Sequence, residues 1–203
     1  MNEHDRSAAL AERLGKPEEP RSVTLLRGET FWQLAQVKYY GRHPIAALFE
    51  ANGLTVEVRS QAGRTTFCDP IYYAGQAYLF PAENELDALE QSFWQKLKEH
   101  GLGGTIKERV GASDEKTAVC LRWDESLWSL AQSKYDDDFE IEGVFEANEL
   151  AASVTNKDGL NTLAEPICFA GHSYILPPRT ELHALSTRYQ ERIKADLLGE
   201  ENI

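Results

Sequence analysis

The side chains in this sequence that could do acid–base, metal or nucleophilic chemistry do not form a recognisable constellation. No histidine pairs with a cysteine or glutamate at the spacing of a metal site. The cysteines form no CxxC pair, which favours reduced, partly buried thiols. The chain also lacks the GxSxG, Walker and GxGxxG patterns. We therefore expect no enzyme, no metal and no cofactor. The residues concerned are His4, His43, His100, His172, His183, Cys68, Cys120 and Cys168.

The composition excludes several classes of protein. The chain has 203 residues, of which 42% are hydrophobic and 27% charged, as in globular proteins. A net charge of −12 disfavours binding to nucleic acid or to an anionic membrane surface. No apolar run approaches the length of a membrane span, which predicts no membrane insertion. Residues 1–13 carry mixed charge without an apolar stretch, which predicts a protein that is cytoplasmic as synthesised.

The elements that must position any site come from an internal repeat. An offset of 96 residues aligns Leu25 with Leu121 and Leu89 with Leu185 without a gap, and 27 of these 65 positions are identical. The block FEAN at residues 49–52 recurs at 145–148. The chain is therefore two copies of one module rather than one large domain.

Each repeat predicts a strand, two helices and a second strand. Residues 23–26 and 119–121 are short β-branched and apolar runs, and a second strand is expected before Pro81 and Pro177. Between them, Thr30 and Ser126 are expected to cap the first helix. Because two strands alone do not form a stable sheet, the helices supply the other layer. We predict an α+β fold of two small β-α-α-β modules, each with a two-stranded antiparallel sheet.

Further expectations concern the core and the domain boundaries. Trp32 and Trp128 are expected in the two cores. Apolar residues at helical spacing predict an amphipathic helix after each second strand. Gly-rich, polar residues separate the copies. The expected boundaries are an N-terminal segment with a short helix (1–20), module one (21–100), a linker (101–116) and module two (117–200).

Two local groupings carry alternatives. Residues 136–138 are three aspartates that could attract Ca²⁺, but calcium sites need spaced ligands around a shaped loop, which favours a solvated turn. His172 follows Cys168, but the first repeat has Gln76 and Tyr72 at these positions, so a core or surface role is favoured.

The motifs of each repeat resemble the LysM (lysin motif) family. In the first repeat they are residues 26–35 (LRGETFWQLA), 38–41 (KYYG), 49–54 (FEANGL) and 71–81 (IYYAGQAYLFP), and the second repeat has WDESLW at 123–128. The chain departs from the family in the longer loops at 55–69 and 151–165 and in the appended helices. The first of these loops predicts a small hairpin.

The resemblance implies a non-catalytic protein that binds peptidoglycan or another N-acetylglucosamine oligomer. In LysM domains that bind sugars, the groove lies between the turn into the first helix and the loop after the second. Backbone groups in such turns can pair with an acetamide, and an apolar side chain can cover its methyl group. The candidate ligand-binding residues are Gly28, Glu29, Thr30, Phe31, Asn52, Gly53, Leu54, Asp124, Glu125, Ser126, Leu127, Glu149 and Leu150.

A second hypothesis is an assembly protein that uses LysM folds to dock other proteins. Relatives of the family join tube to baseplate in phage tails and contractile injection systems, so the chain would be incorporated into such a particle. The aspartates at 136–138 would repel anionic wall polymers. On this ground we expect glycan binding in the first module and structural docking in the second.

Overall fold

The computed structural model describes residues 3–137, 139–157 and 160–199, so Asp138 of the aspartate run lies outside it. The fold is mixed α+β with small two-stranded antiparallel sheets, which confirms the predicted fold class at this level. The chain divides into two compact units. The first unit holds residues 1–59 and 67–104, and the second holds residues 60–66 and 105–203. Within the described ranges, no helix is both long enough and apolar enough to cross a lipid bilayer.

The first unit combines a two-stranded sheet with short helices, with α1 in contact with β1 and α3 in contact with β4. Strand β1 pairs with the antiparallel strand β4, with Arg21 opposite Phe80 and Thr24 opposite Ala77. Helix α3 packs against α4. The elements up to residue 104 are α1 (Glu3–Leu14), β1 (Arg21–Thr24), α2 (Phe31–Lys38), α3 (Ile45–Ala51), β2 (Glu57–Gln61), β3 (Arg64–Cys68), β4 (Ala77–Phe80), η1 (Glu83–Glu85), α4 (Leu86–Lys96) and η2 (Lys98–His100).

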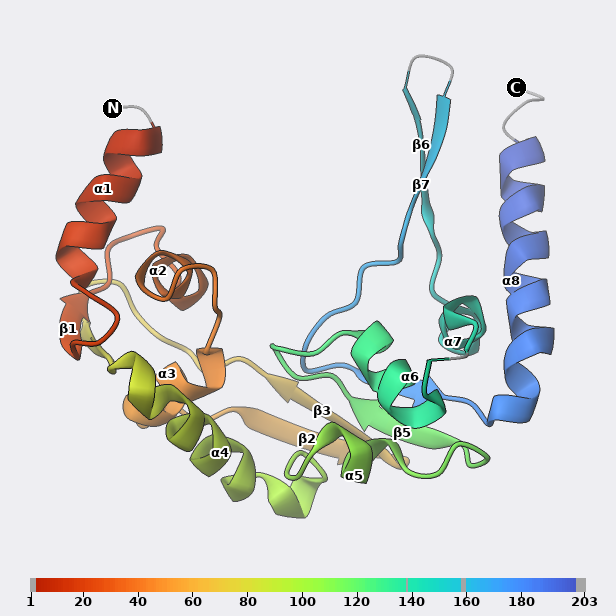
Figure 1. Cartoon of the computed structure of the whole chain (residues 1–203), viewed down its shortest axis with the longest axis horizontal. Coiled ribbons are helices and arrows are strands. Elements are labelled where there is room, and N and C mark those ends of the chain that lie inside the picture. Colours follow the sequence, from red (N-terminus) through yellow and green to blue (C-terminus); the bar gives the residue numbers. More distant parts are fainter. Residues whose placement is uncertain (1–2, 138, 158–159, 200–203) are drawn as a thin grey trace. The chain divides into compact units, whose positions relative to one another are not determined.

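The second unit repeats this arrangement with the same register. Strand β5 pairs with the antiparallel strand β8, with Thr117 opposite Leu176 and Cys120 opposite Ser173. Helix α7 packs beside α8 (Figure 1). The elements are α5 (Ile106–Val110), β5 (Thr117–Cys120), α6 (Leu127–Tyr135), α7 (Ile141–Ala147), β6 (Ser153–Lys157), β7 (Leu160–Ala164), β8 (Ser173–Leu176) and α8 (Arg179–Gly199).

Both predicted helix caps are confirmed. The hydroxyl of Thr30 accepts a hydrogen bond from the Gln33 N–H at 3.2 Å, and the side-chain oxygen of Gln33 accepts one from the Thr30 N–H at 3.1 Å. Ser126 and Ser129 form the same reciprocal pair at the start of α6. These side chains satisfy amides that have no partner within the helix.

The expectation that Trp32 and Trp128 lie in the cores is wrong. Trp32 is 44% exposed and Trp128 is 51% exposed. Helix α2 buries Phe31, Leu34, Ala35 and Lys38, and one step along a helix turns a side chain by about 100° away from its neighbour's face. Trp32 instead stacks on His43, with ring centroids 3.7 Å apart.

Helix α5 lies inside the stretch that was expected to be a linker, and it extends the repeat toward the N-terminus. The Lys38 ammonium donates to the carbonyls of Leu14, Lys16 and Glu19 at the end of α1 and just beyond it, at 2.8–3.0 Å. The Lys134 ammonium donates to the carbonyls of Val110 and Ala112 at 2.8 and 2.6 Å. The repeating unit therefore begins with a helix, α1 or α5, that is held by a buried lysine.

The loop at 55–69 contains the predicted hairpin, formed by β2 and β3. Its two-residue turn, Ala62 and Gly63, has φ values of 50° and 76°, the left-handed conformations that a tight hairpin turn needs. Phe67 on β3 packs its ring against Trp94 on α4. The corresponding insertion in the second unit holds β6 and β7. These two strands pair with each other in antiparallel orientation, and Ser153 lies opposite Ala164.

Candidate functional site

A cavity of about 240 Å³ opens in the second unit. One wall is the turn into α6, residues 125–128, and the facing wall is the loop before β8, with Glu165, Pro166 and Cys168. Its floor is apolar and consists of Leu121, Ile141 and Phe145. The cavity thus lies between a helix start and the long loop that follows the second helix of the repeat.

The lining combines a flat aromatic face with polar groups at the rim. Trp128 is half exposed, so its ring is available to a ligand. Glu165 is exposed and supplies a carboxylate that can accept hydrogen bonds. Burial raises the pKa of the half-buried Cys168 thiol, which keeps it neutral near pH 7. This chemistry suits a neutral ligand with an apolar face and hydroxyl groups.

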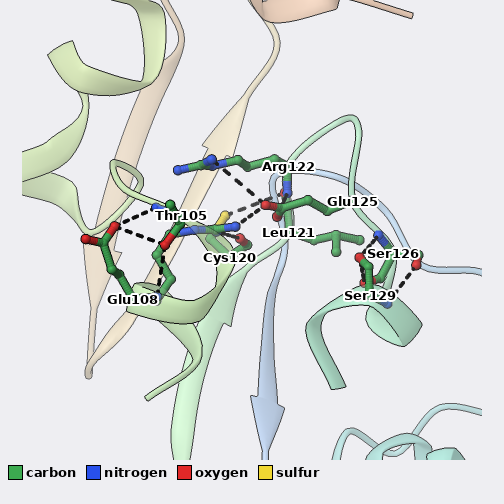
Figure 2. Close-up of polar contacts among 9 residues, drawn as sticks. Thr105, Glu108, Cys120, Leu121, Arg122, Glu125, Ser126 and Ser129 are labelled. Atoms are coloured by element: carbon green, nitrogen blue, oxygen red, sulfur yellow. Dashed lines mark hydrogen bonds and ion pairs between the residues drawn. The ribbon is translucent and has the colours of Figure 1, made fainter. Parts of the chain in front are cut away.

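The turn that forms one wall is fixed by the buried Glu125 carboxylate, which pairs with the Arg122 guanidinium at 3.9 Å (Figure 2) and with a second arginine, Arg109. The Arg109 guanidinium, on α5, donates to the Glu125 carboxylate and also to the Cys120 carbonyl at 3.0 Å. The other carboxylate oxygen of Glu125 accepts from the Arg122 N–H at 3.1 Å. The Glu125 carboxylate therefore positions the turn and is not directed to a ligand. Ser126 likewise uses its hydroxyl as the helix cap.

The first unit uses its candidate residues in the same way. Glu29 pairs with Arg13 at 2.6 Å and accepts from the Leu26 N–H at 2.8 Å. The hydrogen bond from Arg13 lowers the pKa of Glu29. Thr30 is the cap, and Phe31 is fully buried. Gly28, in the turn before them, adopts a φ of 87°.

Asn52 joins the second helix of the first unit to its sheet. Its side chain donates to the carbonyls of Leu48 and Leu79 at 2.8 Å and accepts from the Leu79 N–H at 2.7 Å. Asn148 makes the equivalent three bonds in the second unit. These asparagines are structural ties between a helix end and the last strand.

The remaining candidates do not line the 240 Å³ cavity. Gly53 and Leu54 line a smaller, largely apolar groove of about 150 Å³ beside Phe93 and Leu97 on the first unit. Asp124 and Glu149 are exposed, and the Leu150 carbonyl accepts from Arg192 at 2.9 Å. Of the thirteen candidates, the structure brings together Glu125, Ser126 and Leu127 at the cavity.

The sequence reasoning missed most of the lining, including Trp128 and the wall formed by Glu165, Pro166 and Cys168. A signal for the cavity was present in the repeat. At the 96-residue offset, Phe31 is replaced by Leu127 and Tyr72 by Cys168, so two aromatic rings give way to two smaller side chains.

Comparison with known proteins does not identify a related site. No family model, curated protein or solved structure matches this chain. Among the residues that the structure describes, no group of three or more histidine, cysteine, aspartate or glutamate side chains could hold a metal ion.

Proposed function

We propose that this chain is a non-catalytic, tandem LysM-like protein whose second module binds an N-acetylglucosamine-containing glycan such as peptidoglycan. The β-α-α-β order of both units supports the LysM-like assignment. The observation that carries the binding proposal is the cavity between residues 125–128 and the loop at 165–168. The LysM resemblance implies a sugar groove with the turn into the first helix as one wall, and residues 125–128 are that turn in the second unit.

The cavity suits an acetylated amino sugar in size and in chemistry. The exposed ring of Trp128 would pack against the apolar face of a pyranose. The apolar floor would accept the acetyl methyl group, and Glu165 would accept a hydrogen bond from a sugar hydroxyl. The site is accordingly proposed in the second module, although the charge pattern of the sequence favoured the first.

Titration of the full chain with an N-acetylglucosamine tetramer, followed by amide NMR, tests the proposal. We expect shifts concentrated at residues 125–128 and 165–168, and co-sedimentation with purified peptidoglycan. Trp128→Ala should weaken binding by about tenfold, since it removes the stacking face. Trp32→Ala is the matched control and should leave binding unchanged. The absence of shifts at millimolar sugar together with the absence of co-sedimentation would contradict glycan binding.

An assembly role is the second candidate, and exposed apolar side chains favour it. Ile71 and Tyr73 in the first unit, and Ile167 and Phe169 at the equivalent positions in the second, are all exposed. Exposed apolar groups of this kind can mark protein-docking surfaces. If the chain is part of a phage tail or contractile injection particle, Ile71→Asp with Tyr73→Asp should remove it from purified particles. Retention of this variant at the wild-type level would argue against docking through these residues.

A further inference from the structure

The two units differ at the cavity in a specific way. Eight of the ten lining positions are identical or closely similar at the 96-residue offset, among them Trp32 and Trp128, Pro70 and Pro166, and Phe49 and Phe145. The two positions that change size sharply are Phe31, where the second unit has Leu127, and Tyr72, where it has Cys168.

In the first unit these two large side chains are in direct contact. The rings of Phe31 and Tyr72 are stacked, with centroids 4.6 Å apart and planes 5° from parallel. Tyr78 packs edge-on against Phe31 at 4.9 Å, and Phe49 lies 5.7 Å from it. The stack therefore belongs to a close aromatic cluster and is not a loose surface contact.

We infer that the Phe31–Tyr72 stack occupies in the first unit the space that is open in the second, so that Tyr72 and Cys168 determine which unit binds ligand. This inference rests on the proposed function of the second unit. The Tyr72 ring acts as an internal occupant of the first site and prevents the glycan from entering it. The chain then has one open site and one closed copy of it.

The occupant also indicates which ligand group fits the open site. A tyrosine side chain presents a flat apolar body with one hydroxyl at its end. A pyranose ring with its acetamide offers a similar apolar face and polar edge. We assign the cavity to one such ring of the glycan, seated over Leu127 and Cys168 and facing Trp128.

Reciprocal exchange of these side chains tests the inference. The double variant Leu127→Phe with Cys168→Tyr recreates the first unit's stack in the second and should weaken tetramer binding by about tenfold or abolish it. The variant Phe31→Leu with Tyr72→Cys should open the first site and raise the stoichiometry from one glycan per chain to two. Both exchanges use side chains that the other unit already accommodates, and thermal unfolding checks that each variant is folded.

The outcomes separate this inference from the proposed function. A wild-type chain that binds no glycan contradicts the proposed function. A wild-type chain that binds, together with a filled variant that binds equally well, overturns the inference.

A second measurement does not depend on any glycan. In a Cys68→Ala background, Leu127→Phe should slow alkylation of Cys168 by iodoacetamide, followed by mass spectrometry, because the ring covers the thiol. In the opened variant, the thiol introduced at position 72 should react at the rate of Cys168. If Leu127→Phe leaves the alkylation rate of Cys168 unchanged, the cavity is not closed by ring volume and the inference fails.

Discussion

Arg109 and Glu125 form an ion pair that is almost completely removed from solvent, with side chains 4% and 3% exposed. The equivalent pair in the first unit, Arg13 and Glu29, has the same connectivity but is 32% and 17% exposed. In both units the arginine comes from the helix that precedes the first strand, and the glutamate comes from the turn into the next helix. The same contact is therefore buried in one unit and partly solvated in the other.

This difference predicts unequal effects of removing the arginine. Arg109→Met removes the closer partner of the buried Glu125 carboxylate and leaves it only the Arg122 guanidinium at 3.9 Å, so it should destabilise the protein by about 1.5–3 kcal/mol. Arg13→Met leaves Glu29 accessible to water and should cost at most about 1 kcal/mol. Urea unfolding of the two variants measures both values. Equal losses would show that burial does not govern the contribution of this pair.

The buried lysines should be required for docking the preceding helices. Lys134→Met removes the donor shared by the carbonyls of Val110 and Ala112 and the hydroxyl of Thr117. Since buried acceptors left without a donor each cost about 1–3 kcal/mol, we expect a loss of about 3 kcal/mol. Hydrogen exchange should also accelerate at the amides of α5. Lys116→Met, at an exposed lysine, is the control and should change neither measurement.

Glu149 offers a stabilising substitution. It has a φ of 54° just after α7, where the first unit has Gly53 with a φ of 62°. A residue with a Cβ is strained in this left-handed conformation, whereas glycine is not. Glu149→Gly should therefore raise the unfolding free energy by about 1 kcal/mol, and Gly53→Ala should lower it by a similar amount. Thermal unfolding of each variant measures whether its stability rises or falls. A Glu149→Gly variant less stable than wild type would contradict the proposed backbone strain at Glu149.

The buried tyrosines predict a loss of stability at alkaline pH. Burial raises the pKa of Tyr39 and Tyr135 well above the ordinary value, and their hydroxyls donate to the carbonyls of Pro81 and Pro177. Above about pH 10 the unfolded chain loses these protons while the folded chain keeps them, so stability is complete below that pH and falls as pH rises further.

Phenylalanine variants isolate this effect. The double variant Tyr39→Phe with Tyr135→Phe lacks the ionisable groups, and its unfolding free energy should fall less steeply between pH 9.5 and 11. The comparison with wild type is needed because burial lowers the pKa of Lys38 and Lys134, which acts in the opposite direction. Parallel slopes for wild type and variant would exclude the tyrosines as the cause.

Local patterns were sufficient to predict much of the fold. The 96-residue repeat, the α+β class and the caps at Thr30 and Ser126 all follow from residue type and spacing. The large apolar area of Trp32 suggested a place in the core. Helical periodicity instead selects Phe31, Leu34 and Lys38 as the buried face. The helical period alone would have given the correct answer.

The extension of the repeat and the cavity were harder to predict. The match of ERLG at residues 12–15 with ERVG at 108–111 pointed to the helix before each first strand, but it is short and lies in a stretch with few other identities. The cavity depends on side-chain volume at Leu127 and Cys168, which are 41 residues apart in the sequence and meet only through the fold. Sequence motifs and hydrophobic periodicity do not predict which side chains from distant parts of the chain lie together.

The contacts that hold the first unit together span short stretches of chain, and this has a consequence for synthesis. Lys38 reaches back 24 residues to Leu14, and Tyr39 reaches forward 42 residues to Pro81. These partners have all been synthesised before the second repeat is complete, and domains generally fold in order from the N-terminus. If two similar repeats were unfolded at the same time, a strand of one could pair with the equivalent partner strand of the other. Translation in sequence favours the pairing of β1 with its own β4 before β8 exists.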